Sequence, residues 1–462
     1  METIYFDKQI FSYLFKGDKP IYQKFLLDLL KSKDKFLYCY SHGHLLDLKN
    51  DKTNIKYEEL NFMEKLVDDN YLSYHATEKR TSCYLARPNE AFKEVEEEEV
   101  FSFSSIFNDI DLSYATDEQR ESVTRAIDIL VNRKFEFNLP NMQDLPEELK
   151  TPLSKIIPSG LGSVSIMQWV EEFMNMLKVM EEDKSVYKGL RGVVDKYINN
   201  GKFTVDYNDI DFNDDLKNSV LQKSFIDFVN NNLNPEGDKE VTGYDFYVNA
   251  YFTLDLLGIS KEPASKVKFN NVMNDGYHSY YGAFCDYIVS DDQGLLKKTK
   301  ALYRLLGIST KVYHIDDFIS CFSLLMNSFE KDAKSFFDLL INDLKNGFVL
   351  ENKKSLKYNR NTTLIKPLHN YFGFFNRIEN IQDEDGNFIV LRRVSNNYSN
   401  FNFFRQYKGI VDNAFKLFGY DNDNKGEFLW ENEIGEINKK IWDGRIWYFG
   451  KFKILLEINE GI

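Results

Sequence analysis

Residues 285–292 read CDYIVSDD. Residues 286–290 of this segment, with Tyr287, Ile288 and Val289 at their centre, predict a buried strand. The following residues, 292–306, have the apolar spacing of a helix that ends at Gly307, and 311–315 (KVYHI) predict a second strand. A strand, a helix and a strand in this order favour two parallel strands joined by a helical crossover.

A similar alternation opens the chain. Residues 3–6 (TIYF) form a short apolar run that ends at Asp7, and residues 36–40 (FLYCY) form a second run. Between them Pro20 suits the first turn of a helix, and Ser41 is a favourable cap for a helix after the second strand. We therefore expect both flanks to belong to one α/β unit with a parallel sheet.

The segments between and after these flanks have a different pattern. Residues 61–244 look mostly helical, so we predict one α/β domain made of 1–60 and 245–325 and interrupted by a helical insert. Residues 326–462 predict a C-terminal α+β region. Within that region Asp385-Gly386 lies between two strand-like runs, which indicates a β-hairpin.

Composition limits the class of protein. The chain has 462 residues, of which 43% are hydrophobic, and its four cysteines are scattered without a CxxC pair. It contains no run of about 18 apolar residues and no basic-then-apolar leader, so we expect a cytoplasmic protein with reduced cysteines and no membrane partner. The net charge of −14 argues against a general nucleic-acid coat protein.

Four carboxylates stand where predicted strands give way to helices, or on those helices. Asp7 follows the first strand and Asp292 follows strand 286–290. Asp47 lies on the helix after the second strand, and Asp275 is expected to open a helix ahead of 286–290. The carboxyl ends of parallel strands line one edge of a sheet, where sites form. Carboxylates that converge there repel one another unless cations are bound, and Mg²⁺ or Mn²⁺ prefer such oxygen ligands.

These segments resemble the four acidic motifs of PIN-domain nucleases. The first motif is matched by IYFD at 4–7 and the second by YSHGHLLDL at 40–48. The third and fourth are matched by DGYH at 275–278 and by SDD at 290–292. The matching segments cover under a third of the chain, and the resemblance rests on the order of the motifs within an α/β frame.

The resemblance implies a PIN-like domain in which Asp7, Asp47, Asp275 and Asp292 are the catalytic residues and the ligands of one or two Mg²⁺ or Mn²⁺ ions. It implies a phosphodiesterase, with RNA favoured over DNA because many members of the family are ribonucleases. The sequence departs from the family in two ways. The second acid is Asp where Glu is more usual, and the insert between the second and third motifs is unusually long.

Each acid also has a purely structural interpretation. Asp is a favoured helix cap, so Asp7, Asp275 and Asp292 could serve as caps, and Asp47 could be an ordinary exposed helical residue. A cap and a metal ligand are compatible, because capping uses only one carboxylate oxygen.

Other polar residues near the four acids are candidates for support. His44 and His278 could orient a carboxylate, contact phosphate or be structural, and Ser290 could support Asp292 through its hydroxyl group. Asp286 and Asp291 are alternatives to Asp292 as the fourth acid.

Basic residues indicate where a nucleic acid would bind. Residues 345–410 hold eleven Lys or Arg against five Asp or Glu. Cations mixed with aromatics suit phosphates and stacked bases, although a solvated loop gives the same pattern. The candidates, from this region and from the segment after Asp292, are Lys353, Lys354, Lys357, Arg360, Lys297 and Lys298.

The resulting hypothesis is a metal-dependent nuclease, most simply an endoribonuclease. A toxin or a phage-defence effector would fit the accessory regions. Two alternatives remain open: a non-catalytic RNA-binding or scaffold protein that keeps a PIN-like fold, and a structure-specific DNA nuclease.

Overall fold

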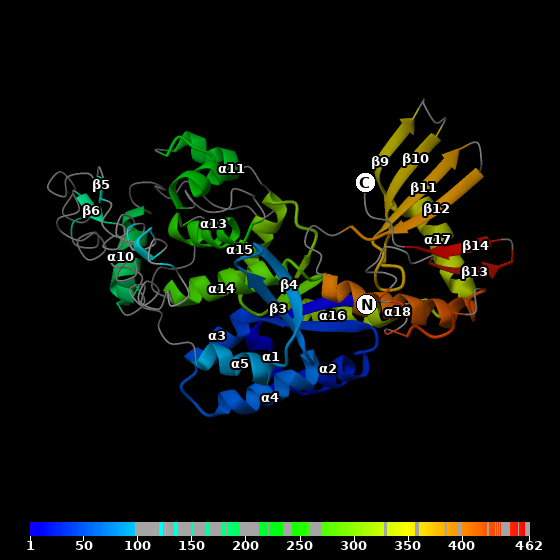
Figure 1. The fold of residues 1–462 in the computed structure, drawn as a ribbon, viewed down its shortest axis with the longest axis horizontal. Helices are drawn as coiled ribbons and strands as arrows, with labels where there is room; N and C mark the ends of the chain where they lie inside the picture. Colours follow the sequence, from blue (N-terminus) through cyan, green and yellow to red (C-terminus); the bar gives the residue numbers. More distant parts are fainter. Residues whose placement is uncertain are drawn as a thin grey trace.

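The computed structural model describes residues 1–97, 243–258 and 269–327 without a break and most of 330–457, whereas only short pieces are described between 98 and 242. The chain has a mixed α/β architecture, with a six-stranded, mostly parallel sheet at its centre and a smaller antiparallel sheet near its C-terminus (Figure 1). The strands of the central sheet, in spatial order, are β4 (Arg80–Leu85), β3 (Asn70–His75), β2 (Phe36–Ser41), β1 (Glu2–Phe6), β7 (Tyr287–Ser290) and β8 (Lys311–His314).

The two flanks of the chain meet at the middle of this sheet. Strand β1 pairs in parallel with β2 on one side and with β7 on the other, and β7 pairs in parallel with β8. The two flanks, which we expected to belong to one α/β unit, therefore share this sheet. The carboxyl ends of β1 and β7 lie side by side as a result, which brings the residues that follow them to one edge of the sheet.

The sheet continues past residue 60, where we expected the insert to begin. Strand β3 pairs in parallel with β2, and β4 pairs antiparallel with β3 as the sheet's edge. The burial of these two strands is mixed, whereas β1, β2 and β7 are buried throughout. A strand near an edge lacks the continuous apolar run of a central strand, so its sequence is harder to identify. Most of the remaining insert lies outside the described residues.

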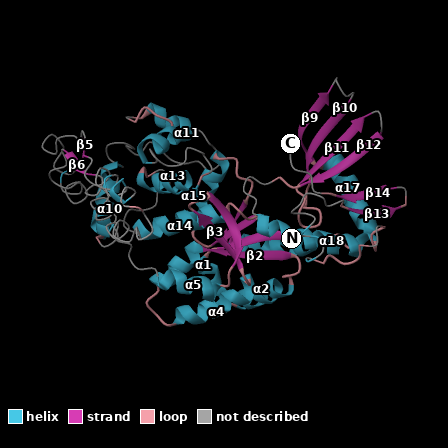
Figure 2. Ribbon diagram, viewed as in Figure 1, coloured by secondary structure: helices cyan, strands magenta, loops and turns pink. Residues whose placement is uncertain are grey.

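Helices cover both faces of the sheet, because side chains alternate along each strand. Ile4, Phe6 and Val289 point into one core, and Tyr5 and Ile288 point into the other. Figure 2 shows the strands enclosed between the two helical layers. Helices on the first face are α1 (Lys8–Lys16), α2 (Pro20–Lys31), α3 (His42–Asn50), α4 (Ile55–Val67), α5 (Pro88–Glu97) and α16 (Ile315–Asn327).

The second face is covered by three longer helices, and described pieces of the insert belong to the same core. The longer helices are α13 (Tyr244–Leu256), α14 (Phe269–Gly282) and α15 (Gln293–Leu305). The pieces are α10 (Lys184–Val194), α11 (Phe212–Asp215), η3 (Leu216–Asn218), α12 (Phe225–Phe228) and η4 (Val229–Leu233). The strands β5 (Lys134–Glu136) and β6 (Ser163–Ser165), which pair antiparallel, are also described. Among the described helices, none combines the length and the apolar composition needed to cross a bilayer.

The C-terminal region has its own core and its own sheet. Strand β11 and strand β12 form the hairpin expected around Asp385-Gly386. Arg393 binds Asp286 at 2.7 Å and Arg405 binds Asp69 at 2.6 Å, so two ion pairs connect this region to the central sheet. Its elements are α17 (Ala333–Asn346), β9 (Phe348–Ser355), β10 (Arg360–Lys366), β11 (Arg377–Asp383), β12 (Gly386–Arg392), α18 (Asn400–Phe418), β13 (Arg445–Phe449) and β14 (Phe452–Leu456).

Candidate metal centre

Asp7 lies at the carboxyl end of β1 and is buried, with 7% of its surface exposed. Its backbone N–H donates to Val289 O at 2.9 Å, which holds it against β7. It occupies the N-cap position of α1, but its side chain makes no capping hydrogen bond. Instead Asp7 Oδ2 accepts a hydrogen bond of 2.7 Å from the Ser290 hydroxyl. The Asp7 carboxylate is therefore not a helix cap. Ser290, which we expected to support Asp292, also donates to Asp7.

Asp47 reaches the same edge from helix α3. Ser41 caps this helix, as expected, by accepting from the Gly43 N–H. The Asp47 carboxylate is half-buried and accepts from Asn274 Nδ2 at 2.8 Å and from His278 Nε2 at 2.9 Å. Both donors lie on α14, so Asp47 is not an ordinary exposed helical residue.

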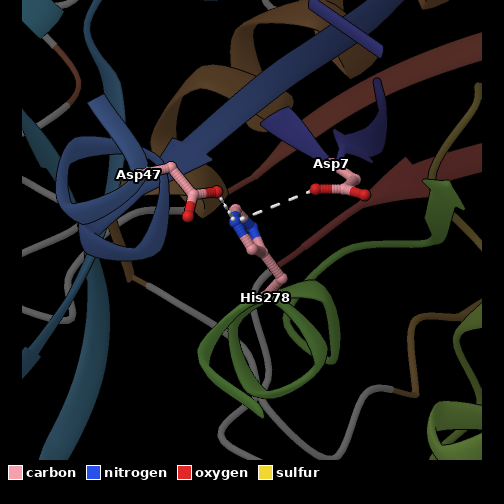
Figure 3. A group of neighbouring side chains, drawn as sticks. All are labelled: Asp7, Asp47 and His278. Atoms are coloured by element: carbon pink, nitrogen blue, oxygen red, sulfur yellow. Dashed lines mark hydrogen bonds and ion pairs between the residues drawn. The ribbon is translucent and has the colours of Figure 1, made fainter. Parts of the chain in front are cut away.

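His278 stands between the two carboxylates, as Figure 3 shows. Its Nε2 lies 2.9 Å from Asp47 Oδ2 and 3.8 Å from Asp7 Oδ1. One ligand atom from each of the three residues falls within 4.8 Å of the others, a spacing that allows a shared ion. Within the described residues this is the one group of three or more such side chains with that spacing.

A buried tyrosine that we did not identify from the sequence completes this network. His278 Nδ1 lies 2.7 Å from the Tyr5 hydroxyl, which in turn lies 2.6 Å from Ser41 Oγ. A fully buried tyrosine on a central strand needs a hydrogen-bond partner, and this requirement was the available sequence signal. Tyr5 fixes one nitrogen of the His278 ring and so directs the other toward Asp47 and Asp7.

The charges of the three central groups follow from their surroundings. Burial opposes the charge of His278, but the hydrogen bond and charge of Asp47, together with Asp7 and Asp275, raise its pKa to about 9. Burial also opposes ionisation of Asp47, but His278 outweighs it and lowers the pKa of Asp47. The pKa of Asp7 is raised, chiefly by burial. At neutral pH His278 is thus an imidazolium paired with Asp47.

His44, in contrast to His278, is neutral. Its Nδ1 accepts from the Ser41 backbone N–H at 3.0 Å, so Nε2 carries the proton and donates to Phe6 O at 2.7 Å. Burial, and next the charge of His278, lower its pKa to about 3. His44 is a neutral residue that connects α3 to the end of β1, and it orients Asp47 only through that helix.

Asp275 and Asp292 interact electrostatically with Asp7, but they lie on different elements of the fold. Asp275 lies inside α14, which starts at Phe269, so our expectation that it opens a helix is wrong. Burial raises the pKa of Asp275 well above its usual value, and the charges of Asp292 and Asp7 add to that rise. Asp292 is exposed and does cap α15, accepting from the Leu295 N–H at 2.9 Å. Its charge also raises the pKa of Asp7.

The alternative acids are engaged elsewhere. Asp286 lies at the amino end of β7, where it accepts from the Thr3 backbone N–H and pairs with Arg393. This is the wrong end of the strand for the site. Asp291 pairs with His314 Nε2 at 2.8 Å and accepts from the Tyr13 hydroxyl, so Asp292 remains the better candidate for the fourth acid.

The basic candidates are widely separated. Lys297 is exposed on α15, but Lys298 is buried beside Asp255 at 3.6 Å and over the Tyr251 ring at 5.0 Å, so our prediction that it steers nucleic acid is wrong. Its position in the helix turns it inward, which residue type alone does not reveal. Lys353, Lys354 and Arg360 are exposed on the C-terminal sheet, and Lys357 lies outside the described residues.

The arrangement fits a divalent cation. Ser290 engages one oxygen of Asp7, and the other oxygen faces the space shared with His278. A buried carboxylate among other acids gains from a cation, and carboxylate oxygens suit Mg²⁺ and Mn²⁺. A neutral His278 would add a nitrogen ligand, which Mn²⁺ accepts more readily than Mg²⁺ does.

Comparisons of the chain with protein-family models, with curated proteins and with solved structures give no match. The function is therefore inferred from the residues of the site itself.

Proposed function

We propose that this protein is a metal-dependent nuclease of PIN-like architecture that hydrolyses phosphodiester bonds, with single-stranded RNA as the first substrate to test. The observation that carries the proposal is the convergence of Asp7, Asp47 and His278 within 4.8 Å at the carboxyl edge of the sheet. Asp275 and Asp292 act electrostatically on the same site.

The residues of the chain have separable tasks in this proposal. Asp7 and Asp47 hold the ion, and His278 either contributes Nε2 or remains an imidazolium that orients Asp47. Asp292 would add negative charge for a second ion, and Asp275, whose ionisation burial opposes, would do so once a cation is bound nearby. A bound Mg²⁺ or Mn²⁺ supplies activation of water and neutralisation of charge on the phosphate. Ser290 keeps one Asp7 oxygen occupied, so the other is directed toward the site.

The direct experiment measures metal binding and cleavage in parallel. Wild-type protein should gain thermal stability with millimolar Mn²⁺, because a ligand that binds only the folded state stabilises it. It should also cut 5′-labelled single-stranded RNA of mixed sequence. Asp7→Asn keeps the acceptor for Ser290 but removes the charge, so we expect it to lose both effects. An Asp7→Asn protein that cuts RNA at the wild-type rate would rule out this site.

Substrate class is decided in the same assay. Single-stranded DNA and branched DNA substrates are run beside the RNA under the same conditions. Faster cleavage of branched DNA would replace the RNA assignment with a structure-specific DNA nuclease while leaving the metal centre unchanged.

One observation favours a second candidate, a non-catalytic RNA-binding or scaffold protein. The imidazolium of His278 already places a positive charge between Asp47 and Asp7, where a metal would sit. A protein that balances its acids internally does not need an ion. This candidate is favoured if the wild-type protein binds RNA but neither cuts it nor gains stability with Mn²⁺.

A further inference from the structure

Helix α15 has an outer face with positive charge only. Its inner face is buried in the core beside the sheet. Lys297, Lys300 and Arg304 are exposed and follow one another at spacings of three and four residues, which places them along one stripe of the helix. Residues 293–305 contain no Asp or Glu, so every charged residue of the helix is a cation.

The stripe starts close to the candidate metal centre. Helix α15 begins directly after Asp292, whose charge acts on Asp7 and Asp275. At about 1.5 Å of rise per residue, Lys297 lies roughly 8 Å and Arg304 roughly 18 Å along the helix from Asp292. The three exposed cations therefore lie at increasing distances from Asp292 along one helix.

The far end of the stripe borders a pocket against the edge strand β8. The pocket has a volume of about 280 Å³ and is lined by Lys300, Tyr303, Arg304, Ile308, Thr310 and Val312. Tyr303 donates its hydroxyl proton to Ser279 O, and Thr310 donates to the backbone oxygens of Ala283 and Cys285. Those hydroxyl protons are engaged within the protein, so Lys300 and Arg304 are the cationic donors that border the pocket.

We propose that this stripe and its pocket bind the phosphodiester backbone of the strand that the metal centre cleaves. The identity of the strand rests on the proposed nuclease function. Lys and Arg bind phosphate through charge-assisted hydrogen bonds, and backbone binding needs no reading of bases. In a chain of net charge −14 a polyanion needs a local run of cations beside the acids, and α15 provides one. The pocket lies too far along the helix to take part in the chemistry, so Lys300 and Arg304 are binding residues.

The test is a charge reversal read out by binding. The variant Lys300→Glu with Arg304→Glu is compared with wild type for binding to a fluorescent single-stranded RNA and to the same sequence as DNA, in EDTA so that no cleavage occurs. The matched control is Lys24→Glu with Lys31→Glu, two exposed lysines on α2, which covers the opposite face of the sheet. Both double variants change the net charge equally.

We expect the α15 variant to lose affinity on the order of tenfold for RNA and DNA alike, and the control to match wild type. The slope of log Kd against log salt should fall by about 1.4, because each phosphate contact on a single strand contributes about 0.7. Equal thermal stabilities of the three proteins establish that all are folded, as expected for exposed positions.

Three results would overturn the proposal: unchanged affinity in the α15 variant, an equal loss in the control, or no binding of either strand by wild type. The nuclease proposal fails separately. If the protein binds RNA or DNA through Lys300 and Arg304 but cleaves neither with any metal, the binding surface is supported and only the nuclease proposal is contradicted.

Discussion

His44 and His278 face each other edge to plane, with ring centroids 4.7 Å apart and an angle of 88° between the rings, yet their pKa values are shifted in opposite directions. His278 is held charged by Asp47, and its charge in turn helps to keep His44 neutral. Two neighbouring imidazolium rings would repel each other, so His278 is charged and His44 is neutral.

This pairing predicts the pH dependence of stability in metal-free protein. His278 has a pKa of about 9 when folded, above its unfolded value, so its contribution is complete below about pH 6.5 and is lost as pH rises through 9. His44 has a pKa of about 3, so its contribution is present above about pH 6.5 and is lost as pH falls toward 3. Urea unfolding in EDTA at pH 5, 6.5 and 9 measures both limbs. In His278→Gln the decline above pH 6.5 should shrink, and an unchanged decline would contradict the assignment.

Removing the charge of Asp292 should strongly reduce RNA cleavage and leave the fold intact. Asn can still cap α15, but it is a weaker ligand for a hard cation, so we expect Asp292→Asn to lose RNA cleavage on the order of a hundredfold or more. Asp275→Asn should behave similarly, and the double variant should be hardly worse than either single one. Asp51→Asn is the control, because its amide oxygen can still accept from the Thr53 N–H. Wild-type cleavage by Asp292→Asn would make that residue a cap only.

The Ser290 hydroxyl should matter for both stability and metal affinity. It donates to Asp7 and accepts from the Asp292 N–H, so Ser290→Ala leaves a buried carboxylate without its donor. We expect a loss of about 1–3 kcal/mol in the free energy of unfolding, and weaker Mn²⁺ binding by calorimetry. Ser290→Thr retains the hydroxyl and serves as the matched variant. Equal losses in the two variants would show that side-chain size, and not the hydrogen bond, is what matters.

Removing the negative charge of Asp255, which lies between the buried cations Lys298 and Arg191, should destabilise the fold. Asp255 is fully buried with Lys298 at 3.6 Å, Arg191 at 3.5 Å and the Tyr187 hydroxyl at 2.6 Å. Asp255→Asn removes the shared negative charge from two buried cations, so we expect a loss of about 3–5 kcal/mol in urea unfolding. Asp214→Asn breaks the exposed pair with Lys217 and should cost far less, because solvent screens surface ion pairs. Similar losses at the two positions would contradict this account.

The sequence was most informative where burial is continuous. Strands β1, β2 and β7 are buried throughout and mostly apolar, so their existence could be predicted, and the order of elements indicated that both flanks belong to one α/β unit. Strands β3 and β4 escaped prediction because strands near an edge mix buried and exposed residues.

The candidate site could be predicted only in part, because the sequence does not reveal the direction of each side chain. Asp7, Asp47 and His278 could be proposed from the sequence, but the contact between Asp47 and His278 spans 231 residues and no local pattern encodes it. Asp275 was placed at the wrong point of its helix, since α14 begins six residues earlier at Phe269. Lys298 shows the same limit, because one position along α15 separates it from the exposed Lys297.

The ion pair between Arg393 and Asp286 lies at the amino end of β7, and the hydrogen bond from Asn370 to Glu2 lies at the amino end of β1. Asp7 and Asp292 lie beyond the opposite ends of these strands, roughly 15 Å away at about 3.3 Å per residue. The same two strands thus contact the C-terminal region at one end and carry the candidate site at the other. These contacts of Arg393 and Asn370 do not involve Asp7 or Asp292, so a substitution at one end of these strands leaves the contacts at the other end in place.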